Sequence, residues 1–307
     1  MKVLFISSGN ATSGISPIIK SQGESLKKEG IELDYFAIKG KGLKGYLTSI
    51  SELRKILKTD TYDIVHAHYW LSAIVASLAG AKPIVASLMG DDVKASPYFK
   101  WIIYLFYYPT WSSIIVKSED MHHALNIKKA NIIPNGVDMN RFKPIDKAVA
   151  LNEVKWDERK KHILFTSNPS RVEKNFELAQ QAFDEINDEN LELHYLKDIP
   201  HEKIPYYYNA SDVVILTSLW EGSPNAIKEA MACNVPIVST HVGDVEKVLS
   251  KTEGCYVSSF DPKDFASKIK SALDFKERTT GRDDIDYLKS ENIAKKIVEI
   301  YNRNKGK

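Results

Sequence analysis

Leu219-Trp220-Glu221-Gly222-Ser223-Pro224-Asn225-Ala226-Ile227-Lys228-Glu229 lies between two short apolar runs, at 212–218 and 236–240. Both runs are rich in β-branched residues and bounded by polar ones, which predicts two buried strands. Between them Ser223 is placed to cap a helix with Pro224 at its first position, where a missing N–H costs nothing. The segment therefore predicts a strand–helix–strand unit whose two strands run parallel.

The start of this helix offers groups that suit an anionic sugar ligand. A helix N-terminus presents unpaired N–H groups and the positive end of the helix dipole, so it can seat a phosphate. Gly222 lets a ligand approach the backbone closely. Glu221 precedes the helix and Glu229 lies inside it, and carboxylates accept hydrogen bonds from sugar hydroxyls. The residues alone leave a second interpretation open, a capped core helix with Glu229 on its solvated face.

The motif E-G-S-P-N-A-I-K-E-A-M-A-C-N-V-P-I-V-S-T, which begins at Glu221, closely resembles the signature of the family 4 retaining glycosyltransferases. The resemblance implies the GT-B architecture, in which two Rossmann-like, doubly wound parallel-sheet α/β domains face a central cleft. It also implies that Glu221 contacts the hydroxyls of the donor sugar and that Glu229 binds the ribose of the nucleotide. The helix N-terminus would hold the diphosphate, with donor-binding candidates Gly222, Ser223, Pro224, Asn225 and Ala226.

Length and composition favour a globular protein. The chain has 307 residues, which suits two α/β domains, and its formal net charge is +2. Its two cysteines, Cys233 and Cys255, lack metal-site spacing and indicate a reducing compartment. The N-terminus is typical of a first strand rather than a signal peptide, and no stretch approaches the roughly 20 apolar residues of a membrane span. We therefore expect a cytoplasmic protein, and its basic residues lack the aromatic interleaving of a nucleic-acid binder.

The N-terminal strand at 3–6 leads into a loop at 7–14, rich in Gly, Ser and Thr, and then into a helix that begins at Pro17. This loop resembles the one that the family presents to the donor diphosphate, which makes Gly14 a donor-binding candidate. A plain turn is the alternative. G-x-G-x-x-G is absent, so a dinucleotide-binding site is not supported.

Three further candidates lie at the ends of two later predicted strands, at 63–68 and 83–88. Ligands gather at the carboxyl ends of strands in a doubly wound sheet. His68 ends one strand and Met89 follows the other, and both are acceptor-side candidates. Many family members have a catalytic histidine where Met89 stands, but a thioether cannot donate a hydrogen bond. Asp91 is the nearest polar substitute and becomes a catalytic candidate. Asp91-Asp92 is not a metal signature, and the resemblance implies no metal at the site.

The sequence leaves two interpretations open for each of two further segments. The basic segment at 39–58 is either a solvated face or a surface attracted to anionic lipid, with Lys39, Lys41 and Lys44 as its first cations. The aromatic segment at 97–111 is either a core helix broken at Pro109 or an interfacial surface for a lipid acceptor.

A second match to the family, I-P-N-G-V-D at 133–138 followed by Arg141-Phe142, closes the N-terminal domain by resemblance. We expect an acceptor-side domain at 1–144, a nucleotide-sugar domain at 145–285, and a helix at 286–307 that returns to the first domain. In the second domain, the loop at 167–174 resembles the one whose Arg and Lys neutralise the diphosphate. Lys174 falls where expected, whereas Arg171 must substitute for Pro169, so both are catalytic candidates.

The sequence thus predicts a glycosyltransferase that moves a sugar from a nucleoside diphosphate donor, expected to be a UDP-sugar, to an acceptor hydroxyl with retention of configuration. No cofactor is expected. The acceptor is expected to be a saccharide or a lipid-linked saccharide in cell-surface polysaccharide or glycolipid synthesis, with peripheral association with an anionic membrane. Alternatives are a nucleotide-sugar epimerase or hydrolase on the same fold, or a catalytically silent sugar-nucleotide-binding partner.

Overall fold

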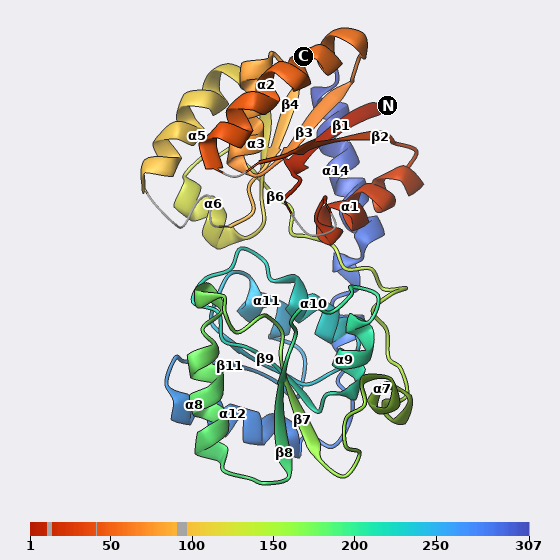
Figure 1. Ribbon diagram of the computed structural model, residues 1–307, viewed down its shortest axis with the longest axis vertical. Coiled ribbons are helices and arrows are strands. Elements are labelled where there is room, and N and C mark those ends of the chain that lie inside the picture. Colours follow the sequence, from red (N-terminus) through yellow and green to blue (C-terminus); the bar gives the residue numbers. More distant parts are fainter. Residues whose placement is uncertain (11–13, 41, 91–96, 307) are drawn as a thin grey trace. The chain divides into compact units, whose positions relative to one another are not determined.

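The computed structural model describes residues 1–10, 14–40, 42–90 and 97–306, and it divides into two compact units (Figure 1). The first unit consists of Met1–Gly136 and Ser290–Lys307, and the second of Val137–Lys289. Each unit has its own parallel sheet with helices on both faces. Two doubly wound α/β units were predicted, and this part of the prediction is confirmed.

The sheet of the first unit has the strand order β2-β1-β3-β4-β5-β6. Its strands are β1 Lys2–Ser8, β2 Glu32–Ile38, β3 Ile64–His68, β4 Ile84–Ser87, β5 Trp111–Val116 and β6 Asn131–Ile132. The central strands are continuous apolar runs because helices cover both faces of the sheet. In β1, for example, the side chains from Val3 to Ile6 are at most 1% exposed.

Two layers of helices enclose this first sheet. The helices are α1 Pro17–Lys28, α2 Gly42–Thr59, α3 Trp70–Ala79, α5 Pro97–Thr110, α6 Glu119–Leu125 and α14 Ser290–Asn304. The core on one face is built by α2, α3, α5 and α6, whereas α1 and α14 pack together on the other (Figure 1).

The C-terminal helix α14 is bonded into the core of the first unit. Tyr301 Oη lies 2.6 Å from His66 Nδ1, and His66 Nε2 lies 2.8 Å from Ser87 Oγ. His66 is fully buried. Where the chain leaves and re-enters this unit, Gly136 packs so closely on Ser290 that an added Cβ would lie 2.7 Å from Ser290 Cα.

The second unit has the strand order β11-β10-β9-β7-β8. Its strands are β7 Lys161–Phe165, β8 Leu191–Tyr195, β9 Val213–Leu216, β10 Ile237–Thr240 and β11 Cys255–Ser258. Its helices are α7 Lys147–Val154, η1 Val172–Lys174, α8 Phe176–Ile186, α9 Ile204–Ala210, α10 Asn225–Ala232, α11 Val245–Leu249, α12 Pro262–Asp274, α13 Gly281–Asp284 and η2 Asp286–Leu288. On one face α8 and α12 form the core, and α7, α9 and α10 lie on the other (Figure 1).

The predicted strand–helix–strand unit is β9–α10–β10, with β9 and β10 parallel and in contact. Its predicted cap is wrong. The helix begins at Asn225, and Pro224 occupies the cap position without a side-chain hydrogen bond. Ser223 lies one residue before the cap, and its hydroxyl accepts from Lys228 Nζ and donates to Asp244 Oδ2, both at 2.5 Å.

The aromatic segment forms α5, and it combines both predicted interpretations. Ile103 is fully buried in the core, whereas Trp101, Leu105 and Tyr108 are 70–76% exposed. These three residues are spaced i, i+4 and i+7, so they form one stripe along the helix. The predicted break at Pro109 is wrong by one residue, because α5 continues to Thr110.

Candidate functional site

Two of the predicted site residues meet at the carboxyl end of the second unit's sheet. The Lys174 ammonium pairs with Glu221 Oε1, and Ser218 Oγ donates to the same oxygen at 2.8 Å. Both partners are about 15% exposed. Thr217 Oγ1 donates to the carbonyl oxygens of Lys174 and Asn175 at 2.9 Å and so holds the turn that carries the lysine. A cation and a carboxylate are therefore poised next to the start of α10.

Arg171 lies on the same turn but pairs locally. Its Nε donates to Glu173 Oε1 at 2.8 Å, and its side chain is 55% exposed. The N–H of Leu219 donates to the carbonyl of Glu173 at 2.9 Å, which ties this turn to the loop that leaves β9. Arg171 is therefore free to reorient at the surface, in contrast to the half-buried Lys174.

The N-terminus of α10 presents its backbone without a side-chain cap. Gly222, Ser223 and Pro224 are buried, and Asn225 and Ala226 are the half-buried first residues of the helix. Asn225 Oδ1 is buried and has no hydrogen-bond partner among the residues that the structure describes. Uncapped N–H groups and an unsatisfied polar atom are what an anionic ligand with hydroxyl or amide donors requires.

A buried ionic network stabilises the segment at the N-terminus of α10. Lys228 is 1% exposed, and its Nζ lies 2.5 Å from Ser223 Oγ and 3.9 Å from Asp244 Oδ2. Burial lowers the pKa of Lys228, and the Asp244 carboxylate opposes this shift. The sequence analysis missed both residues. The only signal in the sequence was the position of Lys228, which lies about one and a half helical turns beyond Ser223.

The loop after β10 packs directly on the loop before α10. Gly243 has φ +58°, and an added Cβ would lie 2.7 Å from the Gly222 carbonyl oxygen. Any side chain here would meet both a strained backbone and a steric clash. Gly243 therefore sets the position of Gly222.

Glu229 lies in a second polar cluster whose residues come from three distant segments of the second unit. Tyr208 Oη donates to Glu229 Oε2 at 2.9 Å, and His201 Nε2 lies 4.0 Å from Oε1. Arg141 Nη1 lies 2.6 Å from His201 Nδ1. Burial raises the pKa of Glu229 to about 7, against the opposing effects of the Tyr208 hydrogen bond and the Arg141 charge.

Three residues of this cluster, Arg141, His201 and Tyr208, were not predicted from the sequence. Arg141 carried a signal, since it belongs to the second family match. His201 and Tyr208 carried none, because tertiary packing of α9 and of the turn before it brings them to Glu229.

The predicted residues of the first unit lie at or near the carboxyl ends of its strands. His68 is the last residue of β3, but it is only 2% exposed and stacks on His66 with ring centroids 4.4 Å apart. Burial lowers the pKa of His68 to about 3, so the ring is neutral. Gly14 has φ +77°, Met89 is half-buried after β4, and Asp91 lies outside the described residues.

Two family models match the chain, one in each unit. "Glycosyltransferase Family 4" matches residues 20–141, and "Glycosyl transferases group 1" matches residues 177–274. The second match includes Glu221 and Glu229.

Several curated proteins are similar in sequence. The UDP-Gal:alpha-D-GlcNAc-diphosphoundecaprenol alpha-1,3-galactosyltransferase of Escherichia coli is 27% identical, over 83% of this chain and 76% of that protein. The putative teichuronic acid biosynthesis glycosyltransferase TuaC of Bacillus subtilis is 24% identical, over 65% of this chain and 58% of that protein. A D-inositol 3-phosphate glycosyltransferase of Geodermatophilus obscurus is 23% identical, over 69% and 59%. This chain spans less than two thirds of the latter two relatives.

Solved structures share the fold over nearly the whole chain. Sucrose-phosphate synthase from Thermosynechococcus elongatus has a TM-score of 0.84 at 17% identity, covering 99% of this chain and 98% of that one. Anabaena HepE in complex with UDP and glucose has a TM-score of 0.76 at 16% identity, covering 99% and 100%.

Proposed function

Because the chain belongs to the glycosyltransferases of the GT-B fold, we propose that it transfers a sugar from a nucleoside diphosphate sugar to a hydroxyl of a glycan acceptor. The observation that carries this proposal is the contact between Lys174 and Glu221 beside the uncapped N-terminus of α10. The helix N-terminus and Lys174 bind the diphosphate, since both favour negative charge. Glu221 accepts hydrogen bonds from the sugar, and Glu229 accepts them from the ribose.

The Lys174–Glu221 pair has a role in this reaction. In the free protein each charge neutralises the other in a half-buried place, where an unpaired charge is costly. Donor binding brings a diphosphate for the ammonium and hydroxyls for the carboxylate, so each group exchanges one partner for another. As the sugar–phosphate bond breaks, charge develops on the diphosphate, and Lys174 with Arg171 stabilises it.

We propose retention of configuration through attack on the same face of the sugar that the diphosphate leaves, with the leaving phosphate oxygen taking the proton from the acceptor hydroxyl. The donor is a UDP-sugar. The E. coli relative is named for UDP-Gal, and the Anabaena structure is described as a complex with UDP and glucose. Those ligands fit a site that offers a helix N-terminus for phosphates and two carboxylates for hydroxyls.

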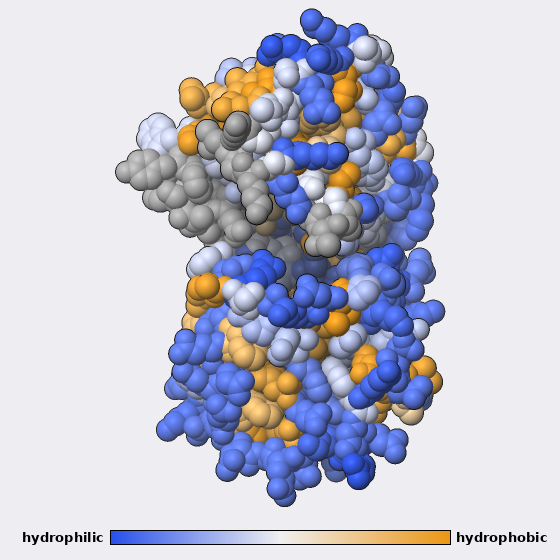
Figure 2. Space-filling view, in the orientation of Figure 1, coloured by the Kyte–Doolittle hydropathy of each residue, from blue (hydrophilic) through white to orange (hydrophobic). Residues whose placement is uncertain are grey.

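The acceptor that we propose is a lipid-linked saccharide of a cell-surface glycan, reached at the cytoplasmic face of a membrane. The E. coli relative's name specifies a diphosphoundecaprenol acceptor. Figure 2 shows hydrophobic residues on the surface of the first unit. Trp101, Leu105 and Tyr108 form an exposed stripe along α5 of this unit. None of the described helices is both long and apolar enough to span a bilayer. We propose that the interaction is peripheral. Lys39 of the same unit is exposed, and Lys41 lies outside the described residues.

A donor panel tests the proposal. Purified protein is titrated with UDP, GDP and ADP and with their glucose and galactose derivatives, and both thermal shift and release of free nucleotide are measured. The expected result is selective stabilisation by UDP-sugars, with slow UDP release that an acceptor accelerates. Epimerised sugar without UDP release would indicate an epimerase. Saturable binding with no turnover on any acceptor would indicate a silent binding partner.

A further inference from the structure

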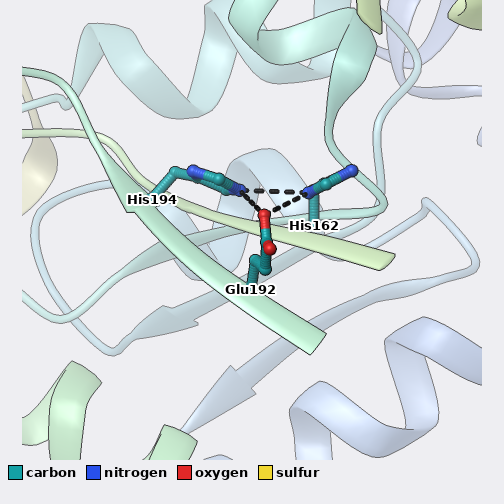
Figure 3. Close-up of side chains that lie close together, drawn as sticks. All are labelled: His162, Glu192 and His194. Atoms are coloured by element: carbon teal, nitrogen blue, oxygen red, sulfur yellow. Dashed lines mark hydrogen bonds and ion pairs between the residues drawn. The ribbon is translucent and has the colours of Figure 1, made fainter. Parts of the chain in front are cut away.

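A second group of polar side chains lies on the sheet of the second unit, apart from the site described above. His162 is on β7, and Glu192 and His194 are on β8, which is the edge strand of this sheet. In the register of these strands His162 is paired with Glu192, and all three side chains project from the face that α7 and α9 cover. Figure 3 shows the three side chains pointing toward one another.

The spacing of the three ligand atoms matches a metal site. His162 Nδ1 lies 3.0 Å from His194 Nε2, and Glu192 Oε2 lies 3.5 Å from His194 Nε2 and 3.8 Å from His162 Nδ1. A point equidistant from three atoms so spaced lies about 2.0 Å from each, which is the length of Zn–N and Zn–O bonds in proteins. A metal ion therefore fits between the three atoms with little movement.

Groups around the cluster fix the orientation of each ligand. His162 Nε2 lies 2.9 Å from the carbonyl oxygen of Asp157, so it carries the proton and leaves the lone pair of Nδ1 facing the cluster. Lys160 holds Glu192 Oε1 at 2.9 Å and leaves Oε2 free. The His194 ring stacks on Trp156 with centroids 3.7 Å apart and an angle of 14°. Such outer partners are typical of metal ligands.

The hydrogen bonds of the two imidazole rings fix the tautomer of each. Without a metal, His194 Nε2–H donates to His162 Nδ1. When a metal binds, the His194 proton moves to Nδ1, which solvent can mediate because this side chain is 20% exposed. Solvent access also leaves room for a water molecule as a fourth ligand.

We propose that His162, Glu192 and His194 bind a divalent transition-metal ion, with Zn²⁺ as the preferred ion, which joins the edge strand β8 to β7. Two imidazoles and one carboxylate suit Zn²⁺, whereas Mg²⁺ and Ca²⁺ prefer sites made of oxygen atoms. The site is structural in this proposal. It stabilises the two strands whose following segments carry Lys174 and Tyr208, and it does not depend on the identity of the donor or acceptor.

The test is calorimetric titration of ZnCl₂ into full-length protein that has been freed of its purification tag and treated with a chelator. The expected result is one saturable site, a higher Tm with Zn²⁺, and visible absorption bands with Co²⁺ of the intensity typical of tetrahedral coordination. Glu192→Gln and His194→Ala should each weaken Zn²⁺ binding at least about tenfold. Glu192→Gln is isosteric, so its Zn²⁺ affinity tests the proposal even if His194→Ala does not fold.

His241→Ala is the matched control, because His241 forms a 2.9 Å pair with Glu246 in the same unit and is 66% exposed. This variant should bind Zn²⁺ as the wild type does. The proposal is overturned by the absence of a saturable Zn²⁺ site, by equal affinity in the wild type and the cluster variants, by loss of binding in His241→Ala, or by a preference for Mg²⁺.

Discussion

The raised pKa of Glu229 gives a prediction that separates a ribose-binding carboxylate from a structural one. If only the ionised carboxylate accepts hydrogen bonds from both ribose hydroxyls, UDP affinity depends on the ionised fraction. With a pKa of about 7, about 10% of the protein is competent at pH 6 and about 90% at pH 8. The apparent Kd scales inversely with the competent fraction, so it should fall about tenfold between these two pH values.

The perturbation is Glu229→Gln, which keeps the shape of the side chain and the contact with Tyr208 but does not titrate. Its UDP affinity should be lower than that of the wild type at pH 8 and should lose the dependence that belongs to Glu229. The phosphate of UDP itself titrates near pH 6, and the variant retains that contribution, so the difference between the two profiles isolates Glu229. Calorimetric titration of UDP at pH 6, 7 and 8 provides the measurement.

The same variant has a stability signature with a defined sign. In the unfolded chain Glu229 ionises near its ordinary pKa of 4.5, whereas in the native state it ionises near 7. Below pH 4.5 both states are protonated, and between pH 4.5 and 7 the unfolded state loses its proton first. The free energy of unfolding should therefore fall by about 3 kcal/mol across this window in the wild type and by that much less in Glu229→Gln. Parallel pH profiles for the two proteins, in binding and in denaturant unfolding, would refute the reasoning.

Four further predictions address the rest of the site and the surface of α5. Lys174→Ala should weaken UDP binding by roughly 10- to 100-fold, the value of one charge-assisted hydrogen bond, as measured by calorimetry. Glu221→Gln should lower the transfer rate while leaving UDP affinity nearly unchanged, and an equal loss of both would assign Glu221 to the nucleotide. Gly243→Ala should both lower the Tm and weaken UDP binding, because the added Cβ would lie 2.7 Å from the Gly222 carbonyl oxygen. An unchanged Tm would show that the loop moves enough to accommodate the methyl group. Replacing the exposed stripe of α5 by serine should abolish co-sedimentation with anionic vesicles at low salt without lowering the Tm, and persistent binding would place the membrane contact elsewhere; the residues changed are Trp101, Leu105 and Tyr108.

The fold was predictable because its signals are local. Short apolar runs that end in polar or glycine-rich loops identify parallel strands buried on both faces, and the proline at the start of α1 marks a helix boundary. The same local reasoning failed at Ser223, where residue type and position favour a cap. There the hydroxyl oxygen accepts from the buried Lys228 instead, and its proton goes to Asp244, 21 residues away.

The composition of the site was less predictable because it depends on contacts between distant segments. Glu221 and Lys174 were identified from separate motifs, yet their ion pair spans 47 residues and follows from no spacing in the sequence. Tyr208 and His201 reach Glu229 only because α9 packs beside α10. The cluster on β7 and β8 could be predicted only in part. The i, i+2 spacing of Glu192 and His194 is visible in the sequence, but the position of His162 beside them depends on the register of the two strands.

The close approach of Gly136 to Ser290 has a consequence for how this chain can be rearranged. Just beyond it, the N–H of Val137 donates to the carbonyl of Leu288 at 2.9 Å, so the outgoing and returning segments run side by side. In topology the second unit is an insertion into the first, with its two ends adjacent. Because Ser290–Lys307 follows the second unit in the chain, the first unit can be completed only after the second unit has been synthesised. The same adjacency makes residues 137–289 a contiguous segment that can be exchanged for the corresponding unit of a related protein at two neighbouring junctions.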